Sequence, residues 1–207
     1  MHRKIATVAV IAFATTAAAG PYAGVGYQAG AQRVERNSLR DPMVDGRALD
    51  QSGHESVSSV RVLAGHRFND RWALEAAFQR PTLETSIEET DLGTGDDEEW
   101  ESSIRSTHLS LAPVFHHRMS GRAELRLSAG LLYGDYKLVR SHSLDLENGP
   151  DQQFSRVTDS ESKLGAMAGV GVTYRTPWQV EVLAEALHQR TSVVSDSSVV
   201  LGLVYRF

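Results

Sequence analysis

The most informative absences in this sequence are those of cysteine, of long apolar runs and of excess positive charge. The chain has 207 residues and no cysteine, so an exported fold must hold together without disulfides. Lys and Arg number 21 against 26 Asp and Glu, and this acidic balance argues against nucleic acid as a partner, because phosphate binding requires clustered basic residues. No segment reaches the roughly 18 apolar residues that a membrane-spanning helix requires. The composition therefore excludes a helical membrane protein.

The N-terminal segment predicts export. A short basic region, residues 1–4, is followed by an apolar stretch, residues 5–17, and by small residues up to Ala19. This order is typical of a secretory signal peptide, with Ala17 and Ala19 in the positions that signal peptidase reads. We expect cleavage after Ala19, so that residues 1–19 are the signal peptide and residues 20–207 form a single domain.

Beyond residue 20, apolar residues recur at every second position, which is the period of a β-strand. The clearest case is residues 123–134, where Ala, Leu and Tyr alternate with Glu, Arg, Ser and Gly. Eight strands are expected, near residues 21–31, 57–68, 72–80, 104–116, 122–138, 162–175, 179–188 and 199–207. The sequence therefore predicts an all-β fold of eight antiparallel strands.

The connections between these strands alternate between tight turns and long polar loops. Short turns at one end and long loops at the other are typical of outer-membrane barrels, whose turns face the periplasm and whose loops face outward. A soluble barrel also alternates, but it buries its apolar face. Three features favour the membrane barrel. Glycines crowd the polar face, aromatics gather near strand ends, and the apolar faces of the last four strands carry no charge.

With these features the chain resembles the small eight-stranded outer-membrane proteins of the OmpA/OmpX type. The resemblance covers the signal peptide, the eight strands, the turns, the loops and the terminal Tyr205-Arg206-Phe207. It implies a transmembrane up-and-down β-barrel in the outer membrane of a Gram-negative bacterium, surrounded by lipid and lipopolysaccharide and monomeric. It also implies that the barrel-assembly machinery reads Leu203, Tyr205 and Phe207 in the last strand, after delivery by periplasmic chaperones.

Nine charged residues fall on the polar face and are expected to lie inside the barrel. They are Arg61, Arg67, Glu75, Glu124, Arg126, Lys163, Glu181, Glu185 and Arg206. Buried charges are costly unless they are paired, and the two signs are nearly balanced, so we expect a salt-bridged network that plugs the lumen. The alternative is a small ion-conducting porin, although an eight-stranded barrel is just wide enough for its own side chains.

A run of acidic residues lies between Glu84 and Glu101, and no Lys or Arg interrupts it between Arg80 and Arg105. Such oxygen ligands suit Ca²⁺ or Mg²⁺, but their spacing matches no EF-hand loop. Blocks of like charge repel and stay solvated, so we interpret the run as a mobile external loop or a surface for a basic partner.

Three further motifs could indicate a cofactor site, a metal site or a catalytic site. Gly24-Val-Gly26 lacks the spacing of a dinucleotide fingerprint, and His116-His117 has no third ligand nearby, so no cofactor and no metal are expected. Residues 108–115 resemble a strand of the lipid A deacylases, and His188 lies where the catalytic His of that family would follow.

In that family a Ser stands two residues after the His and a Glu lies in the last strand. Here Arg190 takes the place of the Ser, and no acidic residue follows Asp196. Acyl transfer by Ser needs a nucleophile, a base and an orienting acid within hydrogen-bond reach. We therefore expect no catalytic centre and a structural or surface-interaction role through the external loops, with a deacylase-like enzyme as the alternative.

Overall fold

The computed structural model describes residues 19–35, 43–44, 47–48, 54–89, 97–145 and 152–207. The expected signal peptide, apart from Ala19, lies outside these residues, and its cleavage remains a prediction. In the described part of the chain, no helix is long and apolar enough to cross a bilayer.

The described residues form β-strands joined by turns. The strands are β1 (Gly20–Val34), β2 (Met43–Val44), β3 (Arg47–Ala48), β4 (His54–Arg67), β5 (Trp72–Gln79), β6 (Thr82–Glu89), β7 (Asp97–Arg118), β8 (Ala123–Asp145), β9 (Gln152–Arg175), β10 (Val180–Arg190) and β11 (Val194–Arg206). Strands β2 and β3 form a hairpin of their own, and the other nine belong to one antiparallel sheet.

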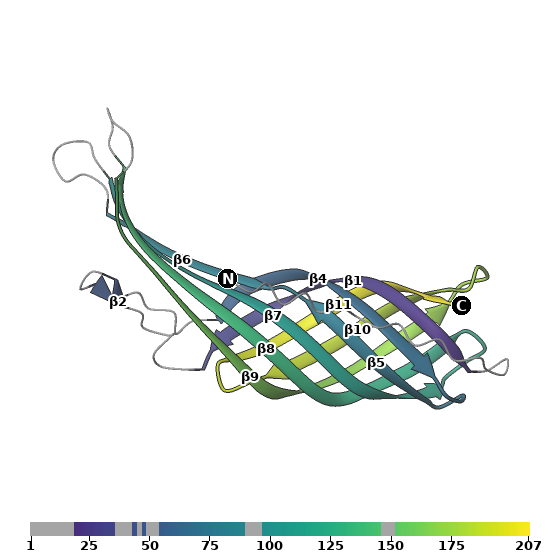
Figure 1. Ribbon diagram of the computed structural model, residues 1–207. Helices are drawn as coiled ribbons and strands as arrows, with labels where there is room; N and C mark the ends of the chain where they lie inside the picture. Colours follow the sequence, from purple (N-terminus) through teal and green to yellow (C-terminus); the bar gives the residue numbers. More distant parts are fainter. Residues whose placement is uncertain (1–18, 36–42, 45–46, 49–53, 90–96, 146–151) are drawn as a thin grey trace.

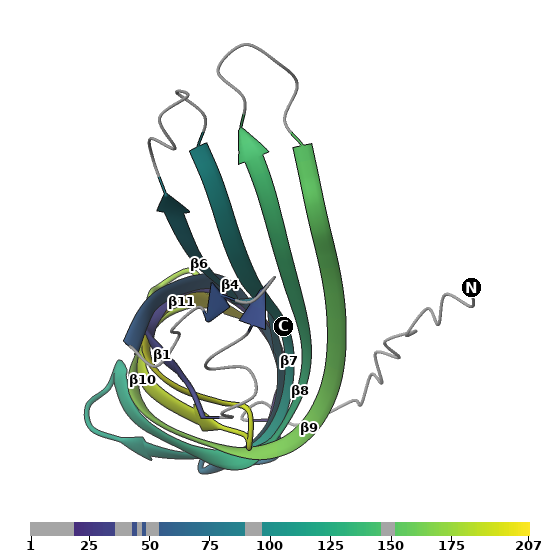
Figure 2. The same cartoon turned by 90° about the vertical axis from the view of Figure 1, so that its left-hand side faces the viewer.

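This sheet closes into an eight-stranded barrel. Its order is β5-β4-β1-β11-β10-β9-β8-β7-β6, and β5 also pairs with β7. Strands β5 and β6 are one strand interrupted at Arg80-Pro81, where proline has no N–H to donate to the ladder. Both pieces pair with β7, so the nine strands form a ring of eight, seen end-on in Figure 2. The predicted eight-stranded antiparallel barrel is therefore confirmed.

Four strands continue far beyond the ring. The long strands β7, β8 and β9 leave the barrel together with β6 and rise above its rim (Figures 1 and 2). The prediction of a loop over the acidic run is thus wrong for residues 82–89 and 97–103, which pair from Thr82↔Arg105 to Glu89↔Glu98. Pairing of β7 with β8 on its other side supplies backbone hydrogen bonds that do not depend on side-chain charge. Asp91 and Asp96 lie outside the described residues.

Short polar side chains make the tight turns. In the turn between β4 and β5, the Asn69 Oδ1 accepts hydrogen bonds from the backbone N–H groups of Arg71 and Trp72 at 2.9 and 3.0 Å. The Ser120 hydroxyl accepts from Ala123 N at 3.1 Å between β7 and β8. Together with the turn between β9 and β10, these turns define the turn end of the barrel, and the opposite rim is its loop end. Phe207 N donates to Pro21 O at 3.1 Å, which places both ends of the domain at the turn end.

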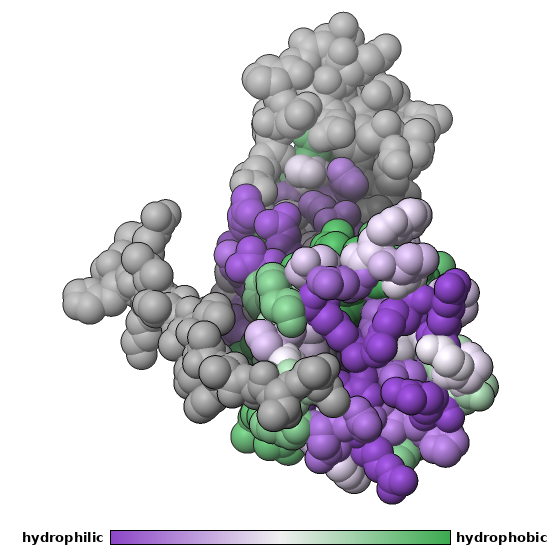
Figure 3. Space-filling model, turned by 90° about the vertical axis from the view of Figure 1, so that its right-hand side faces the viewer, coloured by the Kyte–Doolittle hydropathy of each residue, from purple (hydrophilic) through white to green (hydrophobic). Residues whose placement is uncertain are grey.

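The barrel is inverted relative to a soluble protein, with apolar side chains outside and charges inside. Leu131 and Leu164 are 67% and 74% exposed on the outer face, whereas Arg61 and Arg126 are 2% exposed inside. Strand alternation produces this division, because successive side chains point to opposite faces. The choice of a membrane barrel over a soluble one is therefore confirmed. Seen from the turn end, the surface is dominated by hydrophilic residues (Figure 3).

Candidate functional site

The candidate site is the lumen, where eight strands direct their polar side chains toward one axis. At its centre the Arg126 guanidinium on β8 lies 2.6 Å from Glu75 Oε1 on β5 and 3.4 Å from Glu185 Oε1 on β10. The Tyr22 hydroxyl donates to Glu75 Oε2 at 3.1 Å, and the Ser128 hydroxyl donates to Glu185 Oε1 at 3.0 Å. One arginine thus joins opposite walls of the barrel.

Glycine on β9 makes room for this pair. A Cβ atom added to Gly169 would lie 2.6 Å from both Glu185 Oε1 and Ser128 Oγ. Such a distance is far inside van der Waals contact, so a side chain at this position would force Glu185 or Ser128 to shift.

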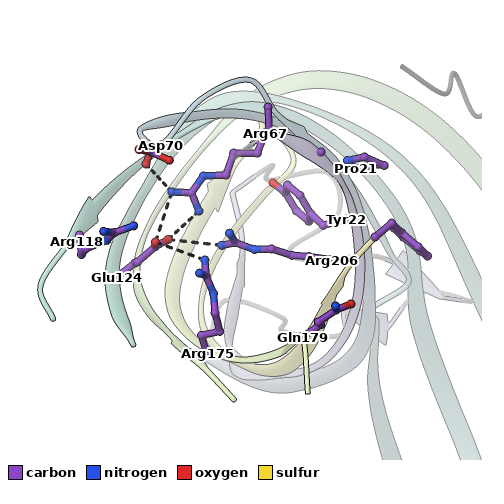
Figure 4. Close-up of a pocket in the computed structure, with 12 residues that line it drawn as sticks. Pro21, Tyr22, Arg67, Asp70, Arg118, Glu124, Arg175, Gln179 and Arg206 are labelled. Atoms are coloured by element: carbon purple, nitrogen blue, oxygen red, sulfur yellow. Dashed lines mark hydrogen bonds and ion pairs between the residues drawn. The ribbon is translucent and has the colours of Figure 1, made fainter. Parts of the chain in front are cut away.

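A second charged layer lies at the turn end. Glu124 on β8 lies 2.8 Å from Arg67, 3.5 Å from Arg206 and 3.8 Å from Arg175. Glu181 on β10 lies 3.0 Å from Arg175 and 2.8 Å from Arg206. These side chains converge on the carboxylates from different strands, as Figure 4 shows for Glu124. A cavity of about 350 Å³ opens at the turn end and is lined by Arg67, Glu124, Arg175 and Arg206, among others.

Toward the loop end, hydrogen bonds to side-chain amides replace the direct ion pairs. The Arg61 guanidinium donates to Gln79 Oε1 at 3.2 Å, and the Gln79 amide donates to Gln189 Oε1 at 2.6 Å. Gln28 donates to Asp196 Oδ2 at 3.0 Å across β1 and β11. A layer of side-chain amides therefore lies between the central arginine and the loop end.

An apolar cluster closes the lumen at the loop end. Its members are buried and come from β1, β4, β6, β7, β8, β11 and the turn before β11: Val34, Val57, Leu83, Ile104, Tyr136, Leu138, Val193 and Val194. The Tyr136 hydroxyl is hydrogen-bonded to Thr191 Oγ1 at 2.8 Å. We call this cluster the apolar cap.

The structure brings eight of the nine expected lumen charges into the barrel interior. Seven of these lie in the two ion-paired layers, and Arg61 lies in the amide layer. Lys163 is the exception: it is half-exposed in the part of β9 above the ring and pairs with Glu161 of its own strand at 2.8 Å. The alternation assigns Lys163 to the correct face but cannot tell how far along the axis it lies.

Several lumen residues escaped the sequence reasoning. Arg175 follows Thr173 in the same phase, so the alternation could have identified it. Tyr22 counts as apolar in a hydropathy pattern, although its hydroxyl donates to a buried carboxylate. His116 points inward, 3.5 Å from Glu124, while the adjacent His117 is exposed, so the two cannot chelate one ion. Among the described residues no group of three His, Cys, Asp or Glu side chains could hold a metal ion.

The proposed assembly residues all face outward. Leu203, Tyr205 and Phe207 are exposed on β11 and just beyond it, and the rings of Tyr205 and Phe207 meet edge to face at 5.2 Å. Other exposed aromatics at the turn end are Phe68, Trp72, Tyr174 and Trp178. An aromatic belt at this level is typical of a lipid–water interface.

His188 also faces outward, on β10 near the loop end. Its Nδ1 lies 2.9 Å from the Ser197 hydroxyl on β11, so a serine does lie beside this histidine, although not at the position that the deacylase pattern requires. In the part of the chain that the structure describes, no carboxylate is hydrogen-bonded to His188. The pair therefore lacks the orienting acid of a hydrolase triad.

Comparisons with solved structures agree with this geometry. Ail, the attachment invasion locus protein of Yersinia pestis, solved with the heparin analogue sucrose octasulfate, is 17% identical, with a TM-score of 0.55 over 92% of this chain and 99% of Ail. Neisserial surface protein A is 18% identical, with a TM-score of 0.52 over 91% and 99%. OprG of Pseudomonas aeruginosa is 12% identical, with a TM-score of 0.53 over 92% and 97%. At these identities the likeness shows the fold alone.

No curated protein sequence matches the chain. The family model described as the outer membrane protein beta-barrel domain, however, matches residues 5–207. This match covers the whole barrel and agrees with its outward apolar face and inward charges. The chain belongs to the outer membrane protein β-barrel domain family.

Proposed function

We propose that this protein is a closed outer-membrane barrel with a structural or surface-interaction role, performed by the strands that extend beyond the ring. The observation that carries the proposal is the bridge of Arg126 to Glu75 and Glu185 across the lumen. Side chains at this level are almost fully buried, which supports a lumen filled by its own side chains. The apolar cap adds a second barrier, because a desolvated ion is costly among apolar groups.

The extended strands supply the interaction surface. Register places Glu88 opposite Glu99 and Glu89 opposite Glu98 on β6 and β7. The sequence of this hairpin is rich in Asp and Glu, so it should attract a partner that carries positive charge. Ail was solved with a polyanionic heparin analogue. The acidic hairpin of this chain favours a partner of opposite charge, a basic protein surface or peptide.

For the membrane we propose the orientation that is usual for outer-membrane barrels. The turn end faces the periplasm and the loop end faces outward, with lipid and lipopolysaccharide around the apolar wall. We propose that residues 1–19 are removed on export, that periplasmic chaperones deliver the chain, and that the assembly machinery reads Leu203, Tyr205 and Phe207. The barrel is proposed to act as a monomer without cofactor or catalytic centre.

Planar-bilayer recording tests the closed lumen. We expect the purified wild-type protein to produce no conductance steps, because the central bridge and the apolar cap act in series. A conductance that changes on Glu75→Ala or Arg126→Ala would instead support the ion-conducting porin and contradict the proposal. The control is Arg122→Ala, an exposed arginine in the turn between β7 and β8.

The enzymatic alternative has a test of its own. Mass spectrometry of lipid A from cells that express the protein should show no loss of an acyl chain. A shortened lipid A that regains its full acylation on His188→Ala would show that the His188 and Ser197 pair catalyses deacylation. That result would overturn the non-enzymatic assignment.

A further inference from the structure

We propose that the outer wall of the barrel carries a binding groove for one acylated, phosphorylated lipid of the outer leaflet, namely lipopolysaccharide. The groove lies across β9, β10, β11 and β1 near the loop end. This inference rests on the proposed placement of the loop end at the outer surface.

The first observation is a hollow in an otherwise bulky apolar wall. A depression of about 610 Å³ is lined on the outer face by Ala29, Ala168, Ala186, His188, Ser197 and Val199, among others. The next row toward the turn end carries larger side chains, with Leu201 beside Ala184 on one side and Tyr27 on the other. Because this wall faces the bilayer, the group that fills the hollow is a lipid acyl chain.

The second observation is a pair of arginines at the loop-end rim of the hollow. Register places Arg33 on β1 and Arg190 on β10 on either side of Ser195 on β11. Both arginines are exposed on the outer face, and two strand spacings put their backbones roughly 10 Å apart. Guanidinium groups bind phosphate through paired, charge-assisted hydrogen bonds, so two long side chains at this distance can converge on one phosphate.

The Glu35 carboxylate leaves the Arg190 guanidinium accessible to a ligand. Arg190 Nη2 lies 3.8 Å from Glu35 Oε2, which is too long for a hydrogen bond, and its side chain is 66% exposed. Among the described residues, the site therefore holds Arg33 and Arg190 against the carboxylate of Glu35, and this charge favours an anionic headgroup.

The third observation is the polar pair between the arginines and the alanines. If His188 Nδ1 accepts a hydrogen bond from the Ser197 hydroxyl, the His188 Nε2–H remains a donor. If Nδ1 donates instead, the Ser197 hydroxyl proton remains free. Either tautomer leaves one donor on a wall that faces lipid, where a hydrogen-bond partner is needed.

The order of these groups along the strands matches the order of groups in the proposed ligand. Arginines come first from the loop end, the His188 and Ser197 pair comes two residues further, and the small-residue floor around Ala186 comes two residues beyond that. Each step of two residues is about 7 Å. Phosphate, ester or amide carbonyl, and acyl chain follow one another in the same sequence in an acylated glycolipid.

The experiment measures binding of purified lipid A to the folded barrel in detergent by native mass spectrometry. We expect the Arg33→Ala/Arg190→Ala double variant to bind lipid A about tenfold more weakly or worse, because charge-assisted hydrogen bonds to phosphate are lost. The control variant, Arg71→Ala/Arg122→Ala, removes two exposed arginines at the turn end and should change binding by less than about twofold. Unchanged binding in the first variant, or an equal loss in the control, would overturn the proposal.

A second pair of variants tests the hollow itself. Ala186→Leu fills its floor, whereas Ala184→Leu adds the same atoms one row away on the same strand and face. Only Ala186→Leu should weaken lipid A binding. Equal effects of the two variants would contradict an acyl-chain site.

Two further ligands identify the headgroup. Lipid A without phosphates should bind wild-type protein as weakly as lipid A binds the double arginine variant, and phosphatidylglycerol should bind more weakly than lipid A. Equal or tighter binding of phosphatidylglycerol would overturn the assignment to lipopolysaccharide. All variants are first compared for heat-dependent mobility in SDS. A variant that shows no mobility shift has not folded as a barrel, whereas a folded variant with unchanged lipid A binding contradicts only the proposed groove.

Discussion

At the centre of the lumen, Arg126 joins walls that are far apart in the chain, because Glu75 lies on β5 and Glu185 on β10. A buried charge that loses its partner keeps its desolvation cost and loses its compensation. The charged residues at the centre of the lumen therefore stabilise the barrel through their pairing.

Truncation of Arg126 tests whether the pairing of the central charges stabilises the barrel. Arg126→Ala should lower the free energy of unfolding by about 3–5 kcal/mol, because it leaves two carboxylates buried without a cation. Urea unfolding in lipid vesicles measures the change, with Arg122→Ala as the exposed control. The triple variant Glu75→Gln/Arg126→Met/Glu185→Gln should recover most of the loss. A triple variant no more stable than Arg126→Ala would contradict a role based on charge pairing.

A substitution of Gly169 tests whether the lumen has room for one added side-chain atom. Gly169→Ala should destabilise the barrel by about 1–3 kcal/mol, since its Cβ would overlap Glu185 Oε1 and Ser128 Oγ. Gly121→Ala is the matched control, because a Cβ there meets nothing within 4 Å. The temperature at which the SDS-resistant form is lost reports both effects. Equal temperatures for the two variants would show that the lumen tolerates the added atom.

Among the elements, β11 has two roles, since it closes the ring against β1 and carries the proposed assembly residues. Phe207→Ser should reduce the amount of barrel in the outer membrane, because it removes the interfacial aromatic in contact with Tyr205. Phe154→Ser is the control, an exposed aromatic on β9 that lies beyond the ring. Quantitative blotting of outer-membrane fractions measures both. Normal insertion of Phe207→Ser would contradict the assembly role.

The strands and their faces could be predicted from sequence because lipid contact imposes an alternation that is visible in a single chain. The extended β6 and β7 could not, since an acidic run has the composition of a loop and acquires its pairing from neighbouring strands. The face of each lumen charge followed from strand phase, but its partners did not. The contact of Arg126 with Glu185 depends on register across three strands, which no local pattern encodes.

For the whole molecule, closure of the sheet predicts resistance to detergent. The ring leaves no free strand edge within the barrel, so SDS at room temperature should leave it folded and fast-migrating, and boiling should shift it to slower mobility. Comparison of boiled and unboiled outer-membrane fractions on a gel measures this. A single unshifted band in the soluble periplasmic fraction would contradict a membrane barrel.

The seam between β1 and β11 has a consequence for the time course of folding. It pairs Tyr22 with Arg206, residues at nearly opposite ends of the chain, and continues without a break to Val34 and Val194. Contacts between such distant residues are entropically late, because the intervening chain must be organised before its ends can meet. Hydrogen exchange during folding should therefore protect the β7–β8 ladder, whose strands follow one another directly, well before it protects the seam. Until the seam forms, the edges of β1 and β11 both stand open, and each can pair with another chain.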